Sequence, residues 1–172
     1  MPTLPPEYTV HAARGLDQLP VRTFHDIAKL RQEVFVVEQD CVYLDLDGRD
    51  LEPTTEQFWV AFSPGDGSTQ SSSTPGKRAR SGSDVAATLR VLDESATEPG
   101  LRAIGRVVTS PEHRGKSLAA ALVEAVIAAH GDVPLYLEAQ SHLTGWYARF
   151  GFEVAGDEFI EDGIPHTPMR RN

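Results

Sequence analysis

The stretch from Ser110 to Leu122, SPEHRGKSLAAAL, joins small residues to positive charge where a strand-like run gives way to a helix-like one. Arg114 and Lys116 flank Gly115, and an alanine-rich apolar run follows. The first turn of a helix leaves backbone N–H groups unpaired and carries about half a positive charge, so it attracts anions. The stretch therefore indicates a phosphate-binding turn. The alternative is an ordinary tight turn with two solvent-facing cations.

The spacing of apolar residues predicts the elements that position this turn. Residues 101–109 before it favour a strand, and the apolar run after it favours a helix that ends near Gly131. Near the N-terminus, one amphipathic helix face is predicted from Phe24, Ile27, Leu30, Val34 and Val37. The full set comprises strands at 9–16, 56–62, 84–92, 101–109 and 133–140, helices at 22–38 and from 118, a loop at 40–53, a short helix at 142–150, and a final strand pair in FEVAGDEFI and PHTPMRR. This order predicts one mixed α/β domain over residues 1–172.

The segment from Ser63 to Asp84 is low in complexity, and Ala79 is its only apolar side chain. Such a segment buries too little surface to offset the entropy of ordering. It is therefore predicted to be a disordered hairpin loop. The basic run KRAR within it, Lys77 to Arg80, is interpreted as a solvated charge cluster.

Composition narrows the class of protein. The chain has 172 residues, 40% of them hydrophobic, and no apolar run long enough to cross a membrane. The N-terminus lacks the pattern of a signal peptide, and the single Cys41 cannot form an internal disulfide, so a cytoplasmic location without membrane association is expected. The formal net charge of −9 disfavours nucleic acid as a partner and weakly favours cationic partners such as amines.

Two motifs together resemble a known family. HRGKSLA resembles the acetyl-CoA pyrophosphate loop of the GNAT N-acetyltransferases, and GWYARFGF, Gly145 to Phe152, resembles their second signature. RQEVFVVEQDCVYLDLDGRDL and EDGIPHTPM resemble the ElaA-like branch, so the similarity covers nearly all of the chain outside residues 63–84. The resemblance implies the GNAT fold, a mixed central sheet flanked by helices. It also implies transfer of an acetyl group from acetyl-CoA to a primary amine, by direct attack in a ternary complex.

The resemblance also implies where acetyl-CoA, the co-substrate, binds. The backbone from Gly115 to Ala120 is expected to hold the pyrophosphate, and Val107 to Thr109 to pair with the pantetheine arm. The N–H of Val108 is expected to polarise the thioester oxygen. The full expected set is Val107, Val108, Thr109, Arg114, Gly115, Lys116, Ser117, Leu118, Ala119, Ala120 and Gln140.

Ser117 departs from the family pattern, which usually has a glycine at this place. A positive φ here would cost a serine about 1–2 kcal/mol. In the first helical turn, by contrast, serine is tolerated and its hydroxyl can cap the helix or touch a phosphate. Because Gly115 and Ala119 remain small, the second conformation is predicted.

Tyr147 matches the family's tyrosine that protonates the leaving thiolate, and a packed aromatic beside Trp146 is the alternative. The attacking amine must first lose a proton: at pKa about 10.4, roughly one amine in 2,500 is neutral at pH 7. Glu38, Glu138 and His166 are candidate bases, and the two glutamates are also candidates for binding the substrate. A water chain to solvent would need no single base.

The acidic stretch from Asp45 to Asp50, which includes Asp47, has carboxylates at spacings that hint at a calcium loop. The helices of an EF-hand are not predicted beside it, so no metal is expected. Two interpretations remain: an acidic lid that attracts a cationic amine through Asp47, or an ordinary solvated loop.

Other functions remain open at this stage. RQEVFVVEQ also resembles acyl-homoserine-lactone synthases, and Ser117 leaves open a non-catalytic domain that senses acyl-CoA or binds a partner. The amine could be a small molecule or part of a peptide, and a homodimer is among the possible assemblies.

Overall fold

A computed structural model of the chain describes residues 3–64 and 84–172. The predictions of a disordered loop and a solvated KRAR cluster concern residues that lie almost wholly outside these ranges. The described elements are β1 (Tyr8–Arg14), η1 (Leu16–Gln18), α1 (Val21–Arg31), η2 (Gln32–Glu38), η3 (Arg49–Leu51), β2 (Glu56–Phe62), β3 (Asp84–Asp93), β4 (Arg102–Thr109), η4 (Pro111–His113), α2 (Leu118–His130), β5 (Leu135–Gln140), η5 (Ser141–Leu143), α3 (Thr144–Ala148), β6 (Glu153–Val154), β7 (Phe159–Glu161) and β8 (Ile164–Arg171).

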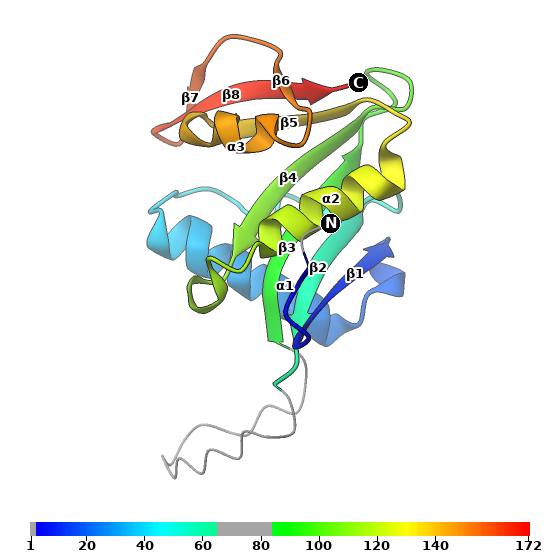
Figure 1. Ribbon diagram of the computed structural model, residues 1–172, viewed down its shortest axis with the longest axis vertical. Helices are drawn as coiled ribbons and strands as arrows, with labels where there is room; N and C mark the ends of the chain where they lie inside the picture. The colour runs from blue at the N-terminus through cyan, green and yellow to red at the C-terminus, as the bar shows by residue number, and fades with distance from the viewer. Residues whose placement is uncertain (1–2, 65–83) are drawn as a thin grey trace.

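One open sheet organises the described chain. Its strand order is β1-β2-β3-β4-β5-β8-β6, and β7 pairs with β8 beside this path. Within the described residues β4 and β5 are the one parallel pair, and all other neighbours are antiparallel. The mixed α/β fold predicted from the sequence is confirmed, and Figure 1 shows β5, β6, β7 and β8 grouped at one end of the molecule.

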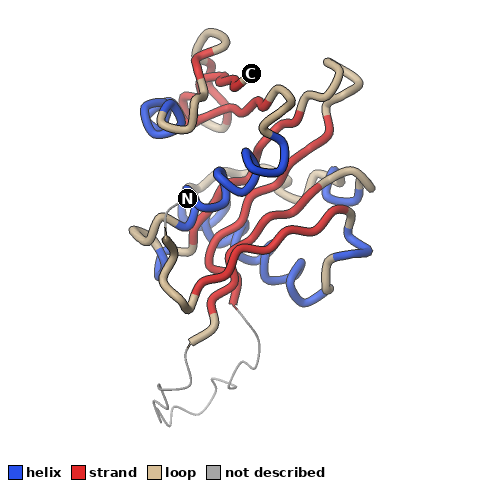
Figure 2. The backbone as a smooth tube through the Cα atoms, turned by 45° about the vertical axis from the view of Figure 1, so that its right-hand side comes forward, coloured by secondary structure: helices blue, strands red, loops and turns tan. Residues whose placement is uncertain are grey.

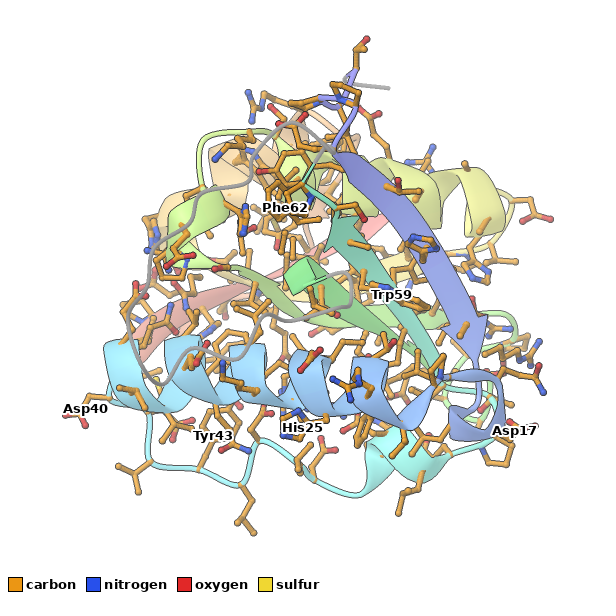
Figure 3. The ribbon with its side chains drawn as sticks, turned by 90° about the horizontal axis from the view of Figure 1, so that it is seen from below. Asp17, His25, Asp40, Tyr43, Trp59 and Phe62 are labelled. Carbon is orange, nitrogen blue, oxygen red and sulfur yellow. The ribbon has the colours of Figure 1, made fainter. Side chains whose placement is uncertain are left out.

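Two helices cover the two faces of the sheet, as the view from below shows (Figure 3). On one face α2 packs against β2, β3 and β4, and Leu118, Leu122 and Val126 enter the main core at intervals of one helical turn. On the other face α1 packs against β3 and β4. Leu30 and Val34 there form a second cluster with Val108 of β4.

The prediction of a single core-facing side for the helix at 22–38 is wrong at its C-terminal end. Its second part, η2, is a π-helical turn, in which the N–H of Gln39 bonds to the carbonyl of Val34 at 2.9 Å. The wider turn rotates the following residues out of phase with α1. Val37, which was predicted to face the core, is therefore 78% exposed. Arg31, the last residue of α1, is fully buried.

The central feature of the sheet is a separation between β4 and β5. They pair only through Arg102–Leu135, Ala103–Tyr136 and Ile104–Leu137. Beyond these pairs β4 continues beside β3, and β5 continues beside β8. In Figure 2 the strands near the C-terminus lean away from the rest of the sheet.

A β-bulge in β4 lies where the two strands separate. Thr88 of β3 is opposite Val108, but Arg90 is opposite Gly105, so β4 has one extra residue between these pairs. Arg106, within the bulge, has φ 55°. A bulge bends its strand and increases the local twist, which accounts for the divergence of β4 from β5.

None of the helices in residues 3–64 and 84–172 is long and apolar enough to cross a membrane.

Candidate active site

Two clefts meet where β4 and β5 separate. We call the first the loop-side cleft: it has a volume of about 830 Å³ and lies between β4, the turn at 113–120 and α3. The second, the hairpin-side cleft, has a volume of about 920 Å³ and is bordered by η2, β5 and the β7–β8 hairpin. The residues that line both clefts are Val107, Val108, Thr109, Arg114, Leu143 and Tyr147.

The turn before α2 has the form of an anion cradle. The first helical hydrogen bond runs from the N–H of Ala121 to the carbonyl of Ser117 at 3.0 Å, so the three preceding N–H groups lie free of the helical ladder. Gly115 has φ 77°, and a Cβ placed there would find no described atom within 4 Å. The predicted cofactor residues from Gly115 to Ala120 line this cleft, except Lys116, whose ammonium bonds to the carbonyl of Glu112 at 3.3 Å.

The predicted conformation of Ser117 is wrong. Ser117 has φ 59° and ψ 23°, which is left-handed, and within the described chain its hydroxyl makes no capping hydrogen bond. Alternating positive φ angles at Gly115 and Ser117 turn the backbone sharply before the helix, and such turns gather N–H groups around an anion. Serine therefore keeps the conformation that glycine would supply more easily.

The choice of Val108 as the N–H donor to the thioester is contradicted by the strand geometry. The N–H of Ser110 bonds to the carbonyl of Ala86 on β3 at 2.9 Å. Peptide groups alternate along a strand, so Val108, two residues earlier, also directs its N–H toward β3, where it faces Thr88. The same alternation directs the N–H groups of Val107 and Thr109 to the opposite side, toward the edge left open by β5.

Tyr147 stands at the junction of the two clefts. Its side chain is 5% exposed and packs against Trp146, with ring centroids 4.7 Å apart, and against Phe152 at 6.1 Å. Burial raises the pKa of Tyr147 to about 12. The phenol is therefore protonated at neutral pH and available as a proton donor. Packing and proton donation, the two roles weighed from the sequence, are compatible at this position.

Glu138 and His166, predicted for the acceptor side, lie on one face of the β5–β8 pair and line the hairpin-side cleft. Gln140, which was predicted to bind the co-substrate, shares that face and lines the same cleft. Gln140 is opposite His166 in the register, and its amide donates to the side-chain oxygen of Gln39 at 3.4 Å. The Nδ1 of His166 lies 2.9 Å from the carbonyl of Ile164. Since a carbonyl only accepts, Nδ1 carries a proton, and in the neutral ring Nε2 is the nitrogen with the lone pair.

Glu38 joins the two clefts through an ion pair. Its carboxylate lies 2.8 Å from Nη2 of Arg114, the first residue of the predicted pyrophosphate loop. The hydrogen bond from Arg114 lowers the pKa of Glu38, which makes Glu38 a weaker base. Both partners are roughly half exposed, so the pair can exchange with water or a ligand.

The acidic stretch from Asp45 to Asp50 belongs to an ion-pair network. Arg31, fully buried on α1, binds Asp45 and Asp50 at 2.8 Å each. The carboxylate of Asp47 lies 2.7 Å from Nη2 of Arg90, so its charge is already compensated. Asp47 is also not among the residues that line the hairpin-side cleft. No group of three metal-ligating side chains occurs in the part of the chain that the structure describes.

This network also holds the bulge of β4. The guanidinium of Arg106 binds Asp45 at 2.9 Å and Asp47 at 3.3 Å, and it lies 5.1 Å above the ring of Tyr43. Sequence reasoning missed this role. A signal was present, because arginines interrupt the apolar runs AATLRVL and AIGRVV, and a charge within a buried strand requires a partner.

Comparison with known proteins identifies the class. The family model described as "Acetyltransferase (GNAT) domain" matches residues 79–172. The crystal structure of an acyl-CoA N-acyltransferase from Pseudomonas aeruginosa is similar to this chain with a TM-score of 0.78 and 33% identity, over 96% of this chain and 99% of that one. The chain belongs to the GNAT family and is an acyltransferase that uses acyl-CoA as co-substrate, which confirms the predicted fold and enzyme class.

Sequence relatives define the branch. A UPF0039 protein of Mycobacterium tuberculosis is 40% identical over 153 residues, which cover 89% of this chain and 86% of that protein. Protein ElaA of Escherichia coli is 33% identical over 159 residues, 90% of each. The ElaA-like resemblance read from the sequence is thus confirmed.

Proposed function

We propose that the protein transfers an acetyl group from acetyl-CoA to a primary amine. The observation that carries the proposal is Tyr147, a buried and protonated phenol at the junction of an anion cradle and a separate cleft. That arrangement suits a direct reaction between two bound molecules, because the donor and the acceptor can enter from opposite sides.

The residues of the loop-side cleft fit the co-substrate. The free N–H groups at the start of α2 suit a pyrophosphate, and Arg114 adds positive charge beside them. The N–H groups of Val107 and Thr109 on the open edge of β4 suit an extended amide-containing arm, which would lie beside β4 like an added strand. Val107, nearest the bulge, replaces Val108 as the donor toward the acyl oxygen.

Proton transfer needs a donor and an acceptor. Acetyl-CoA supplies an activated thioester: the new C–N bond forms as the C–S bond breaks. Tyr147 donates a proton to the departing sulfur, and because a thiol has a pKa near 8.5 this transfer is coupled to the return of a proton from the attacking ammonium to the phenolate. The attacking ammonium loses two protons overall, one of which replaces that of Tyr147. Nε2 of His166 accepts the other and releases it to solvent.

Calorimetric titration with acetyl-CoA tests the proposal at its first step. Gly115→Asp places a side chain and a negative charge in the cradle, and we expect it to abolish binding that the unmodified protein shows at micromolar strength. Gly163→Asp is the matched control, because Gly163 has nearly the same φ, 78° against 77°, and lies in the β7–β8 turn. Equal binding by all three folded proteins would contradict the cradle.

Thiol release then separates the acyl donors. With an accepted amine, acetyl-CoA should be turned over faster than octanoyl-CoA. A preference for the long acyl chain would favour the activity of an acyl-homoserine-lactone synthase. Retained binding with no thiol release from any amine would favour a domain that only senses acyl-CoA.

A further inference from the structure

The charges of the hairpin-side cleft are unevenly compensated. Five arginines line it, and each has a carboxylate partner among the described residues. The pairs are Arg49 with Glu52 and Glu94, Arg90 with Asp47 and Asp50, Arg106 with Asp45 and Asp47, Arg114 with Glu38, and Arg170 with Glu98. The cationic side of the cleft is therefore neutralised before any substrate enters.

Three carboxylates of the same cleft have no basic partner within residues 3–64 and 84–172: Glu138, Glu161 and Asp162. Glu138 accepts a hydrogen bond from the hydroxyl of Tyr136 at 3.0 Å, and this uncharged donor is not a basic partner. All three are exposed at the cleft or its mouth, so each offers its carboxylate to a ligand. The net charge available to a ligand is negative.

The strand register places these charges on the face that carries His166. Glu138 and Gln140 of β5 alternate with buried residues, and Gln140 is opposite His166 on β8. On the other side of β8, Phe159 of β7 is opposite His166 and stacks on its ring at 5.9 Å. Glu161 is two residues beyond Phe159, so it shares this face.

Asp162 and Gly163 form the tip of the β7–β8 hairpin, and Asp162 lines the same cleft as Cys41. The thiol of Cys41 is buried, which raises its pKa, and the nearby charges of Asp162, Asp40 and Glu161 raise the pKa further. Two separate segments thus bring negative charge to the same part of the cleft.

This distribution discriminates between amines. The carboxylate of an amino acid would find every arginine of the cleft already paired. A monoamine would use one carboxylate at most. An amine with a second positive charge would satisfy both ends of the cleft, since two residues along β8 span about 6.8 Å, comparable to an alkyl chain of about four carbons.

We propose that the acceptor is an alkyl diamine or polyamine, whose reacting amine lies beside His166 while Glu161 and Asp162 bind the distal ammonium. This proposal rests on the acetyl transfer proposed above. The hairpin tip thereby selects substrates by charge, and Glu138 contributes to the attraction of the reacting end.

Three amines of similar length test the proposal in the thiol-release assay with acetyl-CoA. They are 1,4-diaminobutane, 1-aminobutane, which lacks the second charge, and 4-aminobutanoate, which reverses it. We expect kcat/KM to be about tenfold higher for the diamine than for the monoamine, because two exposed ion pairs are gained. The aminobutanoate should be the poorest substrate, and added salt should reduce the preference.

The double variant Glu161→Gln, Asp162→Asn removes both charges with little change of shape. Asparagine tolerates the positive φ of Asp162, 49°, so the turn should persist. We expect the diamine-to-monoamine ratio to fall from about ten to about one. The matched control is Asp157→Asn, Glu158→Gln, which makes the same charge change at exposed residues outside the cleft and should keep the ratio.

The outcomes separate this proposal from the one on which it rests. Equal kcat/KM for diamine and monoamine, or a ratio unchanged in the folded double variant, would overturn the diamine proposal and leave acetyl transfer intact. Binding of acetyl-CoA without turnover of the diamine would also overturn it. Failure of acetyl-CoA to bind at all would overturn both.

Discussion

Replacement of Ser117 by glycine should stabilise the protein, contrary to the usual effect of glycine at a structured position. Ser117 has φ 59° and ψ 23°, a conformation that costs a residue with a Cβ about 1–2 kcal/mol. Glycine removes that strain but gives the unfolded chain more freedom, which offsets about 0.4–1 kcal/mol. Taking the middle of both ranges, the net gain is about 0.8 kcal/mol. For a chain of 172 residues this corresponds to a rise in Tm of about 1–4 °C.

Differential scanning calorimetry measures this shift, and two further variants isolate its cause. Ser117→Ala keeps the Cβ and removes a hydroxyl that makes no capping hydrogen bond in the described chain, so its Tm should stay within about 1 °C. Gly115→Ala introduces a Cβ at φ 77°, so the same two terms act with opposite signs and should lower stability by about 0.8 kcal/mol. A lower Tm for Ser117→Gly than for the unmodified protein would refute the argument from backbone strain.

Three further predictions follow from the ion pairs. Glu38→Gln releases Arg114 for the pyrophosphate and should tighten acetyl-CoA binding about two- to fivefold by calorimetry; unchanged affinity would count against competition between the two. Arg31→Met removes the buried cation that Asp45 and Asp50 share and leaves them only their pairs with Arg106 and Arg90, so it should cost about 3 kcal/mol in urea unfolding; a loss under 1 kcal/mol would be inconsistent with the buried network. Hydrogen bonds from Arg90 hold the pKa of Asp47 well below its unfolded value. The contribution of the ionised Asp47 to the free energy of unfolding is therefore complete above about pH 4 and is lost as the pH falls further. Unfolding free energies that stay flat from pH 5 to 2 would contradict this contribution.

The sequence was sufficient for features that depend on local pattern. Strand β2 was predicted with its observed ends, because EQFWVAF is an apolar and aromatic run between turn residues. Helix α2 was also predicted, since its core residues recur at intervals of four. Both follow from neighbours within one turn or one strand.

Features that depend on distant partners were not predictable in this way. The bulge in β4 appears only in its register with β3, and the same register directs the N–H of Val108 toward β3 and away from the open edge. The pairing of Arg90 with Asp47 joins residues 43 positions apart. Neither relation leaves a periodic signal in the sequence.

Ser117 shows a different kind of failure. The family pattern, which usually has glycine at this position, already indicated a positive φ, and the prediction gave more weight to the small neighbours than to that signal. The structure shows that the backbone requirement persists when the residue changes. A glycine within a family motif should therefore be interpreted first as a statement about φ.

The most direct test of acyl transfer at the strand separation is the turnover of acetyl-CoA and 1,4-diaminobutane by Tyr147→Phe, with acetyl-CoA affinity measured on the same samples. The hydroxyl of a buried phenol whose pKa is raised to about 12 is removed, while the ring packing is kept. We expect kcat to fall by about 10²–10⁴-fold with an unchanged Kd for acetyl-CoA. An unchanged kcat would contradict the role of Tyr147 as the proton donor to the thiolate.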